Sequence, residues 1–412
     1  MLSSPTEEAV LAAARAWSAS VGVTRSSSIT RLDRIGVPVA MAVRPGALAG
    51  SLVVTGGKGT TEAAAEIGAR LEAVELAAAE HTRSQVPLVR TTYRAIAAQL
   101  GGPAALLRLC PRMDVRIPLD EEVTAAQGTD LCTAAPRCLP SELVLLPPPP
   151  DAAVRPYFAA SSFGLGCGLT LEQATMHAML EVLERDALSF PSHAGQEWAI
   201  DECSLPDRLK DLVARVRQAD VAVRLLVVRQ ELGLPVAHVV LWDRAETDRR
   251  FVNGGHACAR SLEAALERAL LEALQSRAAF MHGGREDLPS LVEVATEQPR
   301  PGDGCSPNLF QPEPHGAHTP RPTSRSDGPQ GEVDKGSLSD VRHQFSQPIP
   351  DDSAGLAHWL AERGVGPTIR FVLRDGSMGG PWVVRTVIVG CESYVPRLSP
   401  RVGPRLAAWS HG

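Results

Sequence analysis

Paired glutamates in helical segments are the residues of this sequence best suited to chemistry. Three Ala/Leu-rich stretches each begin with a hydroxyl residue that can cap a helix: Thr61, Thr170 and Ser261. Eleven residues later each stretch has a glutamate: Glu72, Glu181 and Glu272. Three residues further the first two have a second acid and the third has an amide: Glu75, Glu184 and Gln275. Residues three apart share a helical face, so the first two stretches each predict a two-carboxylate patch.

The neighbours of these glutamates are apolar, as in Leu71-Glu72-Ala73-Val74 and Leu180-Glu181-Val182-Leu183, which predicts partial burial. Buried like charges are unfavourable unless a cation compensates them. Carboxylate pairs suit Mg²⁺, which commonly joins a few carboxylates to nucleotide phosphates. The pattern therefore indicates a magnesium and nucleotide site, with Arg185, next to Glu184, as a candidate phosphate ligand.

Glycine-rich runs precede the three helical stretches at residues 56–59, 164–168 and 253–255. Read as turns before helix N-termini, they would add backbone N–H donors for phosphate. The glycine spacing around Lys58 does not match a P-loop, and Lys58 alone is interpreted as a surface residue. The alternative for the glutamate pairs themselves is a solvated helix face.

These units alternate with strand-like runs rich in β-branched residues, at 36–43, 50–54, 221–229, 235–242, 368–373 and 382–389. The first helix is expected to begin near Ser4 or Thr6. The fold class is therefore α/β or α+β, built from three repeated units of strand, glycine turn and helix.

The stretch from 298 to 350 is rich in Pro, Gly and Ser and is predicted to be a disordered insertion. It divides one domain into a first part, 1–297, and a C-terminal part, 351–412. His315 and His318 within it are interpreted as solvated linker residues.

Charge and composition exclude several classes of protein. The 412 residues carry 41 basic and 47 acidic side chains without a long basic stripe, which argues against a nucleic-acid partner. No apolar run is long enough for a membrane span, and the amino terminus has no signal-peptide pattern. The eight cysteines form no CxxC pair, so a zinc finger or a disulfide framework is not expected. A cytoplasmic location is expected.

Five segments resemble the YcaO family, the ATP-dependent activators of peptide backbone amides. They are Thr24-Arg25 with residues 31–39, Gly57-Lys58-Gly59 with residues 71–76, residues 162–165 with 177–187, residues 271–277, and residues 383–392. The first looks like the TfuA-associated branch, and His177-Ala178-Met179-Leu180-Glu181-Val182-Leu183-Glu184-Arg185 is the most specific. The resemblance implies a three-part α/β domain that holds ATP among Mg²⁺-binding glutamates.

Carried over by position, the resemblance gives this chain a set of site residues. Mg²⁺ ligands would be Glu72, Glu75, Glu181 and Glu184, and the ATP contacts would be Ser162, Glu72, Glu184, Arg185 and Arg277. Positions that depart from the family's pattern include Gly68, Leu169 and Gln173, with Glu172 a possible substitute at the last, and also Leu76 and residues 389–392. Cys167 is interpreted as a small buried residue rather than a nucleophile, and His177 either as a core residue or as a nucleotide neighbour.

The implied function is O-phosphorylation of a backbone amide in a ribosomal peptide or a protein, giving a thioamide or an azoline. Pro396, Pro400 and Pro404 do not form the alternating proline tail of azoline-forming members, which favours a thioamidation-type protein. The expected partners are the peptide substrate and a separate TfuA-like or leader-binding protein; a homodimer stays open. The alternative is a degenerate, non-catalytic YcaO-like scaffold subunit.

Overall fold

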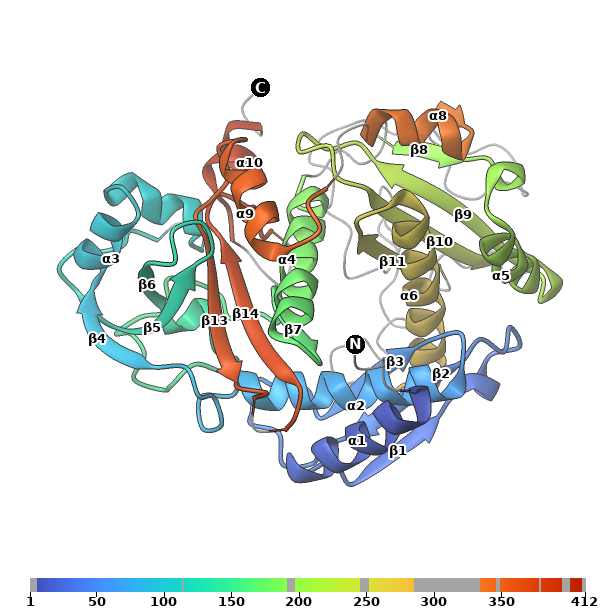
Figure 1. Cartoon of the computed structure of the whole chain (residues 1–412), viewed down its shortest axis with the longest axis horizontal. Helices are drawn as coiled ribbons and strands as arrows, with labels where there is room; N and C mark the ends of the chain where they lie inside the picture. Colours follow the sequence, from blue (N-terminus) through green and yellow to red (C-terminus); the bar gives the residue numbers. More distant parts are fainter. Residues whose placement is uncertain are drawn as a thin grey trace, which may run out of the picture.

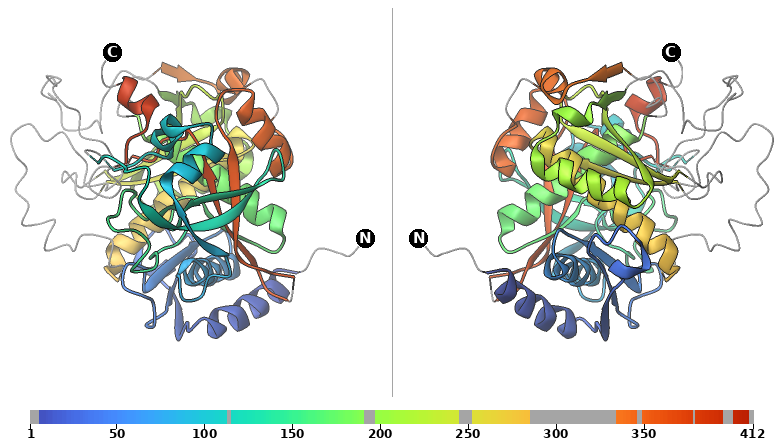
Figure 2. Two further views of the ribbon diagram at one scale, coloured as in Figure 1. Left: turned by 90° about the vertical axis from the view of Figure 1, so that its left-hand side faces the viewer. Right: turned by 90° about the vertical axis from the view of Figure 1, so that its right-hand side faces the viewer.

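A computed structural model describes residues 6–112, 115–190, 197–244, 252–284, 334–345, 349–377, 379–394 and 401–409. Within these ranges the chain forms three sheets of three, five and six strands, each with helices on it. In Figures 1 and 2 the N-terminal unit, coloured blue, lies at one end of the molecule, below the other two.

The N-terminal sheet contains β1 (Arg25–Ser28), β2 (Val39–Val43) and β3 (Val54–Lys58), all antiparallel. Helix α2 (Glu62–Ala79) packs on β2 and β3, and α1 (Glu7–Ser20) packs on α2. The predicted start of the first helix is confirmed, because Thr6 accepts a hydrogen bond from the Ala9 N–H. The alanines of α2 that face the sheet side, Ala65, Ala69, Ala73 and Ala77, are fully buried, which lets the helix pack closely.

The six-stranded sheet has the order β4-β5-β13-β14-β7, with β6 paired to β5. Its strands are β4 (Leu88–Thr92), β5 (Glu122–Asp130), β6 (Pro136–Pro140), β7 (Leu165–Gly168), β13 (Thr368–Arg374) and β14 (Trp382–Ile388). Helix α4 (Leu171–Leu188) packs on β7 and β14, and α3 (Tyr93–Gln99) packs near β4 and β6. This sheet unites segments from both halves of the sequence.

The five-stranded sheet has the order β11-β10-β9-β8-β12. Its strands are β8 (Glu197–Ile200), β9 (Val221–Val228), β10 (Val236–Asp243), β11 (Asn253–Cys258) and β12 (Asp334–Gly336). Helix α6 (Leu262–His282) packs on β10 and β11, and α5 (Asp207–Gln218) packs on β9. An aliphatic core of Leu, Val and Ala side chains lies between this sheet and its helices.

The glycine runs predicted to be turns are edge strands, and this corrects the predicted unit. Strands β3, β7 and β11 each end the order of their own sheet. A Cβ on Gly57 would lie 2.1 Å from the Ala65 carbonyl oxygen, and one on Gly166 would lie 2.3 Å from that of Ala174. Glycine is therefore required where strand backbone meets helix backbone, and the first of these strands lies at 54–58 rather than 50–54.

The predicted insertion, 298–350, lies mostly outside the described residues. Its described part is ordered: β12 pairs in parallel with β8, and α8 (Leu338–Arg342) follows it with the buried side chains Leu338 and Val341. The prediction of disorder is therefore wrong for residues 334–345. Farther along lie α9 (Ser353–Ala361) and α10 (Pro404–Trp409). None of the helices described here is long and apolar enough to cross a membrane.

Candidate functional site

Three helices and three edge strands form a closed ring. Helix α2 packs against β3 of its own unit and β7 of the next; α4 packs in the same way against β7 and β11, and α6 against β11 and β3. Figure 1 shows this arrangement, with α4 and α6 standing above α2. We call the α2–β7, α4–β11 and α6–β3 junctions the first, second and third corners. The repeat found in the sequence is therefore arranged cyclically.

The first glutamate of each helix bonds to the glycine-rich run of its own unit. Glu72 Oε2 accepts from the Gly56 N–H at 2.7 Å, and Glu181 Oε2 accepts from the Gly164 N–H at 3.2 Å. Glu272 forms a hydrogen bond with the His256 backbone. These backbone N–H groups serve the protein's own carboxylates, which corrects the expectation that they would bind phosphate directly.

The second glutamate of each pair reaches the strand of the next unit. Glu75 bonds to the Cys167 backbone at the first corner, and Glu184 Oε2 accepts from the Cys258 N–H at 3.3 Å at the second. At the third corner, a Cβ on Gly56 would lie 2.5 Å from Gln275 Nε2, so the amide occupies the equivalent place. Each corner thus joins two units through one side chain.

The four glutamates that converge here, Glu72, Glu75, Glu181 and Glu184, are called the central glutamates below. Burial raises the pKa of Glu75 well above its usual value, and the charges of Glu181 and Glu72 add to this effect. Burial likewise raises the pKa of Glu181 to about 7, although Arg185 opposes it. Carboxylates from α2 and α4 therefore act on one another, and each would be stabilised in its charged form by an added cation.

Two arginines act on the charge of this group, Arg185 beside Glu184 and Arg385 near Glu181 and Glu75. Arg185 Nη2 lies 3.2 Å from Glu184 Oε1, and its guanidinium lies 5.0 Å from the centre of the Phe163 ring. Arg385, on β14, is 1% exposed and donates to the carbonyl oxygens of Ser161, Phe163 and Val144. Sequence reasoning placed Arg385 in the closing strand but did not assign it to the site. Its contacts fix the segment that leads into β7.

The third corner carries its own cation. Lys58 Nζ lies 2.9 Å from Glu272 Oε2, and the two side chains are 28% and 30% exposed. Burial opposes the charge of Glu272, but Lys58 and then Arg185 outweigh it and lower the pKa of Glu272. Lys58 is thus partly exposed, and the interpretation as a surface residue did not include its ion pair. The sequence signal was the coincidence of Gln275, where the other units have glutamate, with a lysine in the first glycine run.

Other predicted residues lie around the ring with different partners. Arg277 is buried and bonds to Asp33 and Asp243, at 3.0 Å and 2.8 Å, so its guanidinium joins the first unit to the third. These bonds do not support the predicted phosphate contact. Ser162 lies in the turn before β7, where its carbonyl oxygen accepts from the Leu165 N–H. Glu172 accepts from the N–H and hydroxyl of Ser353.

Burial, and then the charge of Glu75, raise the pKa of the Cys167 thiol. A neutral thiol is a poor nucleophile, which agrees with the interpretation that Cys167 is not one. The residue is only partly buried and lines the cavity described below. The departure at Gln173 also has a local role, since its side chain completes a capping box with Thr170 at the start of α4.

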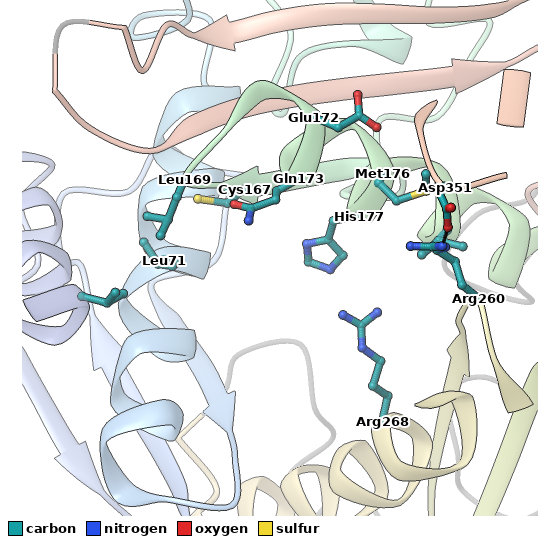
Figure 3. A pocket seen from close by; sticks show the side chains of 13 residues that line it. Leu71, Cys167, Leu169, Glu172, Gln173, Met176, His177, Arg260, Arg268 and Asp351 are labelled. Atoms are coloured by element: carbon teal, nitrogen blue, oxygen red, sulfur yellow. Dashed lines mark ion pairs between the residues drawn. The ribbon is translucent and has the colours of Figure 1, made fainter. Parts of the chain in front are cut away.

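A cavity of about 520 Å³ adjoins the ring between α2, α4 and α6. Its apolar lining is Val10, Leu71, Leu169, Met176 and Leu180, and its polar lining includes Glu172, Gln173, His177, Arg260, Arg268 and Asp351. Figure 3 shows His177 and Arg268 pointing toward each other across this space. Leu71 and Leu180 directly precede Glu72 and Glu181 on their helices, while none of the central glutamates themselves lines the cavity.

The donor set fits Mg²⁺ shared with a nucleotide better than a metal held by protein alone. Among the described residues, no three His, Cys, Asp or Glu side chains are grouped so that they could hold a metal ion by themselves. Carboxylates in pairs, with buried and mutually unfavourable charges, match an ion that takes one or two carboxylates and completes its shell with phosphate oxygens and water.

The chain matches the profile of the family described as YcaO cyclodehydratase, ATP- and Mg²⁺-binding, over residues 56–392. It is 32% identical over 272 residues to an uncharacterized protein of Methanothermobacter thermautotrophicus, covering 65% of this chain and 68% of that protein. It is 30% identical to an uncharacterized protein encoded in the tfuA 3′ region of Rhizobium leguminosarum bv. trifolii, covering 65% of this chain and 64% of that one.

Solved structures share the fold. YcaO from Methanopyrus kandleri bound with AMPPCP and Mg²⁺ superposes with a TM-score of 0.66 at 22% identity, covering 97% of this chain and 94% of that one. A heterocyclase in complex with substrate and cofactor gives a TM-score of 0.66 at 19% identity, covering 90% and 50%. The chain belongs to the YcaO family, whose cofactors are ATP and Mg²⁺.

Proposed function

We propose that this protein activates a backbone amide of a peptide or protein by ATP-dependent O-phosphorylation, with Mg²⁺ held by the central glutamates. The observation that carries this proposal is the convergence of two glutamate pairs from different units, with the pKa values of Glu75 and Glu181 raised by burial and by neighbouring carboxylates. Such an arrangement is unfavourable for the protein alone and favourable around a cation.

The residues of the ring would act by binding and orientation. Glu72 and Glu75 of α2 and Glu181 and Glu184 of α4 would hold Mg²⁺, which supplies neutralisation of phosphate charge. Arg185, held over Phe163 and beside Glu184, is positioned to bind a phosphate oxygen. Backbone bonds from Gly56 and Gly164 fix Glu72 and Glu181 in place. Positioning and charge neutralisation are the main contributions a protein makes to phosphoryl transfer.

The proposed reaction begins at a poor electrophile. A nucleophile, either a neighbouring Cys, Ser or Thr side chain or a sulfide donor, adds to the amide carbonyl. The resulting oxyanion takes the terminal phosphoryl group of ATP with release of ADP, and loss of inorganic phosphate then gives an azoline or a thioamide. The apolar side of the cavity, with Leu71, Met176 and Leu180, would limit access of water to the activated amide.

A thioamide product and a TfuA-like partner protein are our preferred assignment. The N-terminal segment resembles the TfuA-associated branch, and one relative is described by its position near tfuA. A microcin synthetase complex of E. coli also shares the fold, with a TM-score of 0.56 at 13% identity, covering 88% of this chain and 86% of that one. That relative works within a complex, which supports a separate partner here as well.

The second candidate function is a non-catalytic scaffold. It is favoured by Gly68, Leu169 and Gln173, where the family pattern has other residues. Gly68 lies close to β3, with a Cβ on Gly68 predicted 3.2 Å from Gly57 Cα, and Leu169 lines the cavity. All four central glutamates and Arg185 are present, which favours the enzyme.

Calorimetric titration with ATP, in Mg²⁺ and in EDTA, separates the two functions. An enzyme should bind ATP only with Mg²⁺, and Glu181→Gln should remove that binding. Glu66→Gln is the matched control, because Glu66 lies on α2 outside the ring and pairs with Arg15 and Arg70. Absence of Mg²⁺-dependent affinity in the wild-type protein would leave the scaffold as the function.

A further inference from the structure

Strand β1 is the open edge of the N-terminal sheet. The sheet has the order β1-β2-β3, and its other edge strand, β3, packs against α6 in the ring. Figure 1 shows β1 at the outer margin of this unit. None of the strands described here pairs with the outer side of β1. An edge strand with unpaired backbone groups is a template for the backbone of another chain.

The hydrogen bonds between β1 and β2 show which backbone groups of β1 point outward. The register places Ile29 opposite Val39, and the Ile29 N–H donates to the Val39 carbonyl oxygen at 2.8 Å. Bonded and non-bonded pairs alternate along an antiparallel ladder, so Ser27 bonds to β2, whereas Ser26 and Ser28 do not. The N–H and C=O groups of Ser26 and Ser28 therefore point away from the sheet, and no residue in the described part of the chain pairs with them.

A second cavity, of about 320 Å³, lies along this edge. Three consecutive residues of β1, 26–28, line it, and Leu11 of α1 and Ala63 of α2 form apolar walls. We call the outer edge of β1 together with this cavity the β1 groove. Val10, the residue before Leu11, lines the cavity between α2, α4 and α6. Helix α1 is therefore a wall of both cavities.

One carboxylate of the β1 groove has no cation beside it. Glu62, the first residue of α2, lines the groove and accepts from the Ser28 hydroxyl at 2.9 Å. Within the described ranges no basic side chain pairs with Glu62, whereas the other charged side chains of the groove pair with each other. The edge of β1 thus offers donors and acceptors to an extended chain, and Glu62 favours a Lys or Arg side chain in that chain.

We propose that the β1 groove binds an extended segment of the peptide substrate as an added β-strand, with a basic side chain of the peptide beside Glu62. This inference rests on the proposed function and adds to it a place where the substrate is recognised away from its reacting amide. Helix α1 is about 10–12 Å across, a distance that three or four extended residues span. A segment bound here would therefore lie close to the cavity of the ring.

The size and polarity of the β1 groove favour a transient ligand over a second copy of the chain. Strand β1 has four residues, an arginine and three serines. A stable interface between proteins buries about 1,200 Å² or more and has an apolar centre. Main-chain hydrogen bonds and one ion pair suit a peptide that must bind, react and leave.

The test uses a displayed library of random linear 12-residue peptides, selected on the full chain without nucleotide. The affinity of an enriched peptide is then measured by fluorescence anisotropy. Ser26→Pro removes one outward N–H, and an edge strand tolerates proline where the N–H faces solvent. This variant should weaken binding about fivefold or more, the range for a lost hydrogen bond. Ser26→Ala is the matched control, because it keeps the N–H, and should stay within about twofold of the wild-type affinity.

Two further measurements do not depend on the proline variant. Methylation of the peptide's own amides at every second residue should weaken binding in one phase and not in the other, since alternate amides of a strand face β1. Bound peptide should slow amide hydrogen exchange at Ser26 and Ser28, with little change at Ser27, which is already bonded to β2. Circular dichroism checks that each protein variant is folded.

Glu62→Gln tests the basic side chain. It should weaken peptides that carry Lys or Arg about two- to fivefold, the scale of an exposed ion pair, and leave their Met-substituted versions unchanged. Glu8→Gln is the matched control, because it removes an acid from the first turn of α1 and Glu8 does not line the groove.

The substrate role has its own readout. An enriched peptide lengthened by ten residues of Gly and Cys supplies both backbone amides and a nucleophilic side chain. At a concentration below saturation it should raise ATP-dependent phosphate release by the wild-type protein, and Ser26→Pro should reduce that increase in proportion to its loss of affinity.

Several results would overturn the inference. Enriched peptides that bind Ser26→Pro as tightly as the wild-type protein would place their site elsewhere, and a library without enrichment would leave the groove without a peptide ligand. A wild-type dimer that Ser26→Pro dissociates, seen by light scattering, would make the occupant a second copy. Binding at β1 without stimulated phosphate release would assign the edge to a partner protein instead of the substrate.

Failure of the proposed function is seen separately. Peptide affinity is measured without nucleotide, so a wild-type protein that binds no ATP with Mg²⁺ would refute the proposed function by a readout that leaves the peptide affinities untouched.

Discussion

The first two corners of the ring and the third have the same backbone arrangement and opposite charge balance. In all three, a helix lies against the edge strand of the next unit. At the first two corners glutamate pairs meet, and burial raises the pKa of Glu75, Glu181 and Glu184. At the third corner Lys58 neutralises Glu272, and Gln275 replaces the second acid.

This difference indicates what each corner requires. The third has a lysine of the protein beside its acid, and the charge of Glu272 also raises the pKa of Glu184 at the second corner. The first two hold more negative charge than Arg185 and Arg385 offset, so they need an external cation. Under the proposed function, two sides of this ring would bind metal and the third would not.

The largest difference in Mg²⁺-dependent ATP affinity is expected between Glu181→Gln and Glu272→Gln. These two variants change the equivalent position in two units. Glu181→Gln should reduce Mg²⁺-dependent ATP affinity at least about 100-fold, since a metal ligand is lost. Glu272→Gln should reduce it less than about fivefold. Because Glu181 is unfavourable in its charged form, its variant should also melt at a higher temperature than the wild-type protein in EDTA. Similar affinity losses in both variants would remove the distinction between corners.

Replacement of Arg185 should act mainly on turnover. Arg185→Ala should lower ATP turnover about 100-fold, the scale observed when one charge-stabilising donor is removed. Arg185→Lys should keep the positive charge but lose the two parallel N–H donors of the guanidinium, and should therefore recover only part of the rate. Steady-state phosphate release measures both. Arg15→Ala, a change at an exposed ion pair with Glu66, serves as control. If Arg185→Ala turned over ATP at the wild-type rate, a role of Arg185 in binding phosphate would be excluded.

Acidity should affect metal binding and stability in opposite directions. The pKa of Glu181 lies at about 7, against about 4.5 ordinarily, so the folded protein holds a proton there that the unfolded chain releases. The free energy of unfolding in EDTA should therefore fall as pH rises from about 4.5 to 7. Mg²⁺ affinity should rise over the same range, by up to about tenfold per pH unit for each proton displaced.

Thermal melts and Mg²⁺ titrations between pH 5.5 and 8 measure these two trends. Glu181→Gln should make both the melting temperature and the Mg²⁺ affinity less dependent on pH, whereas Glu66→Gln should leave both pH dependences unchanged. If the melting temperature in EDTA rose with pH in this range and Glu181→Gln did not alter it, the central carboxylates would not be crowded as described.

The smallest expected effect concerns Lys58. Lys58→Met leaves Glu272 partly buried without its cation and should lower the free energy of unfolding by about 1–2 kcal/mol, since both side chains keep some solvent contact. Mg²⁺ should restore part of this loss by taking the place of the ammonium group. The double variant Lys58→Met/Glu272→Gln should be more stable than the single one. Equal stability of the single and wild-type proteins would show that the ion pair contributes little.

Much of the repeated architecture could be predicted from sequence. The caps at Thr61, Thr170 and Ser261 are confirmed, each accepting from a backbone N–H three residues later. The strands β9, β10, β13 and β14 lie close to their predicted ranges, because β9, β10 and β14 are apolar and mostly buried and β13 alternates buried with half-buried residues. Local pattern was sufficient for these elements.

Other features depend on contacts distant in sequence. Glycine-rich β3 has no intrinsic preference for a strand, and its conformation is explained by the helix that packs against it. Half-exposed β4 and polar β5 lack a clear alternating pattern and were missed. Asp33, one partner of Arg277, and Glu272, the partner of Lys58, lie 244 and 214 residues away, so only the fold could reveal these pairs.

The central claim is tested most directly by a crystal of the protein with Mn²⁺ and AMPPCP. An anomalous difference map shows where the metal lies, independently of turnover or partner proteins. The account predicts metal peaks between the nucleotide phosphates and the central glutamates, and none beside Glu272 and Lys58. A peak at the third corner, or bound nucleotide without metal at the first two, would contradict it.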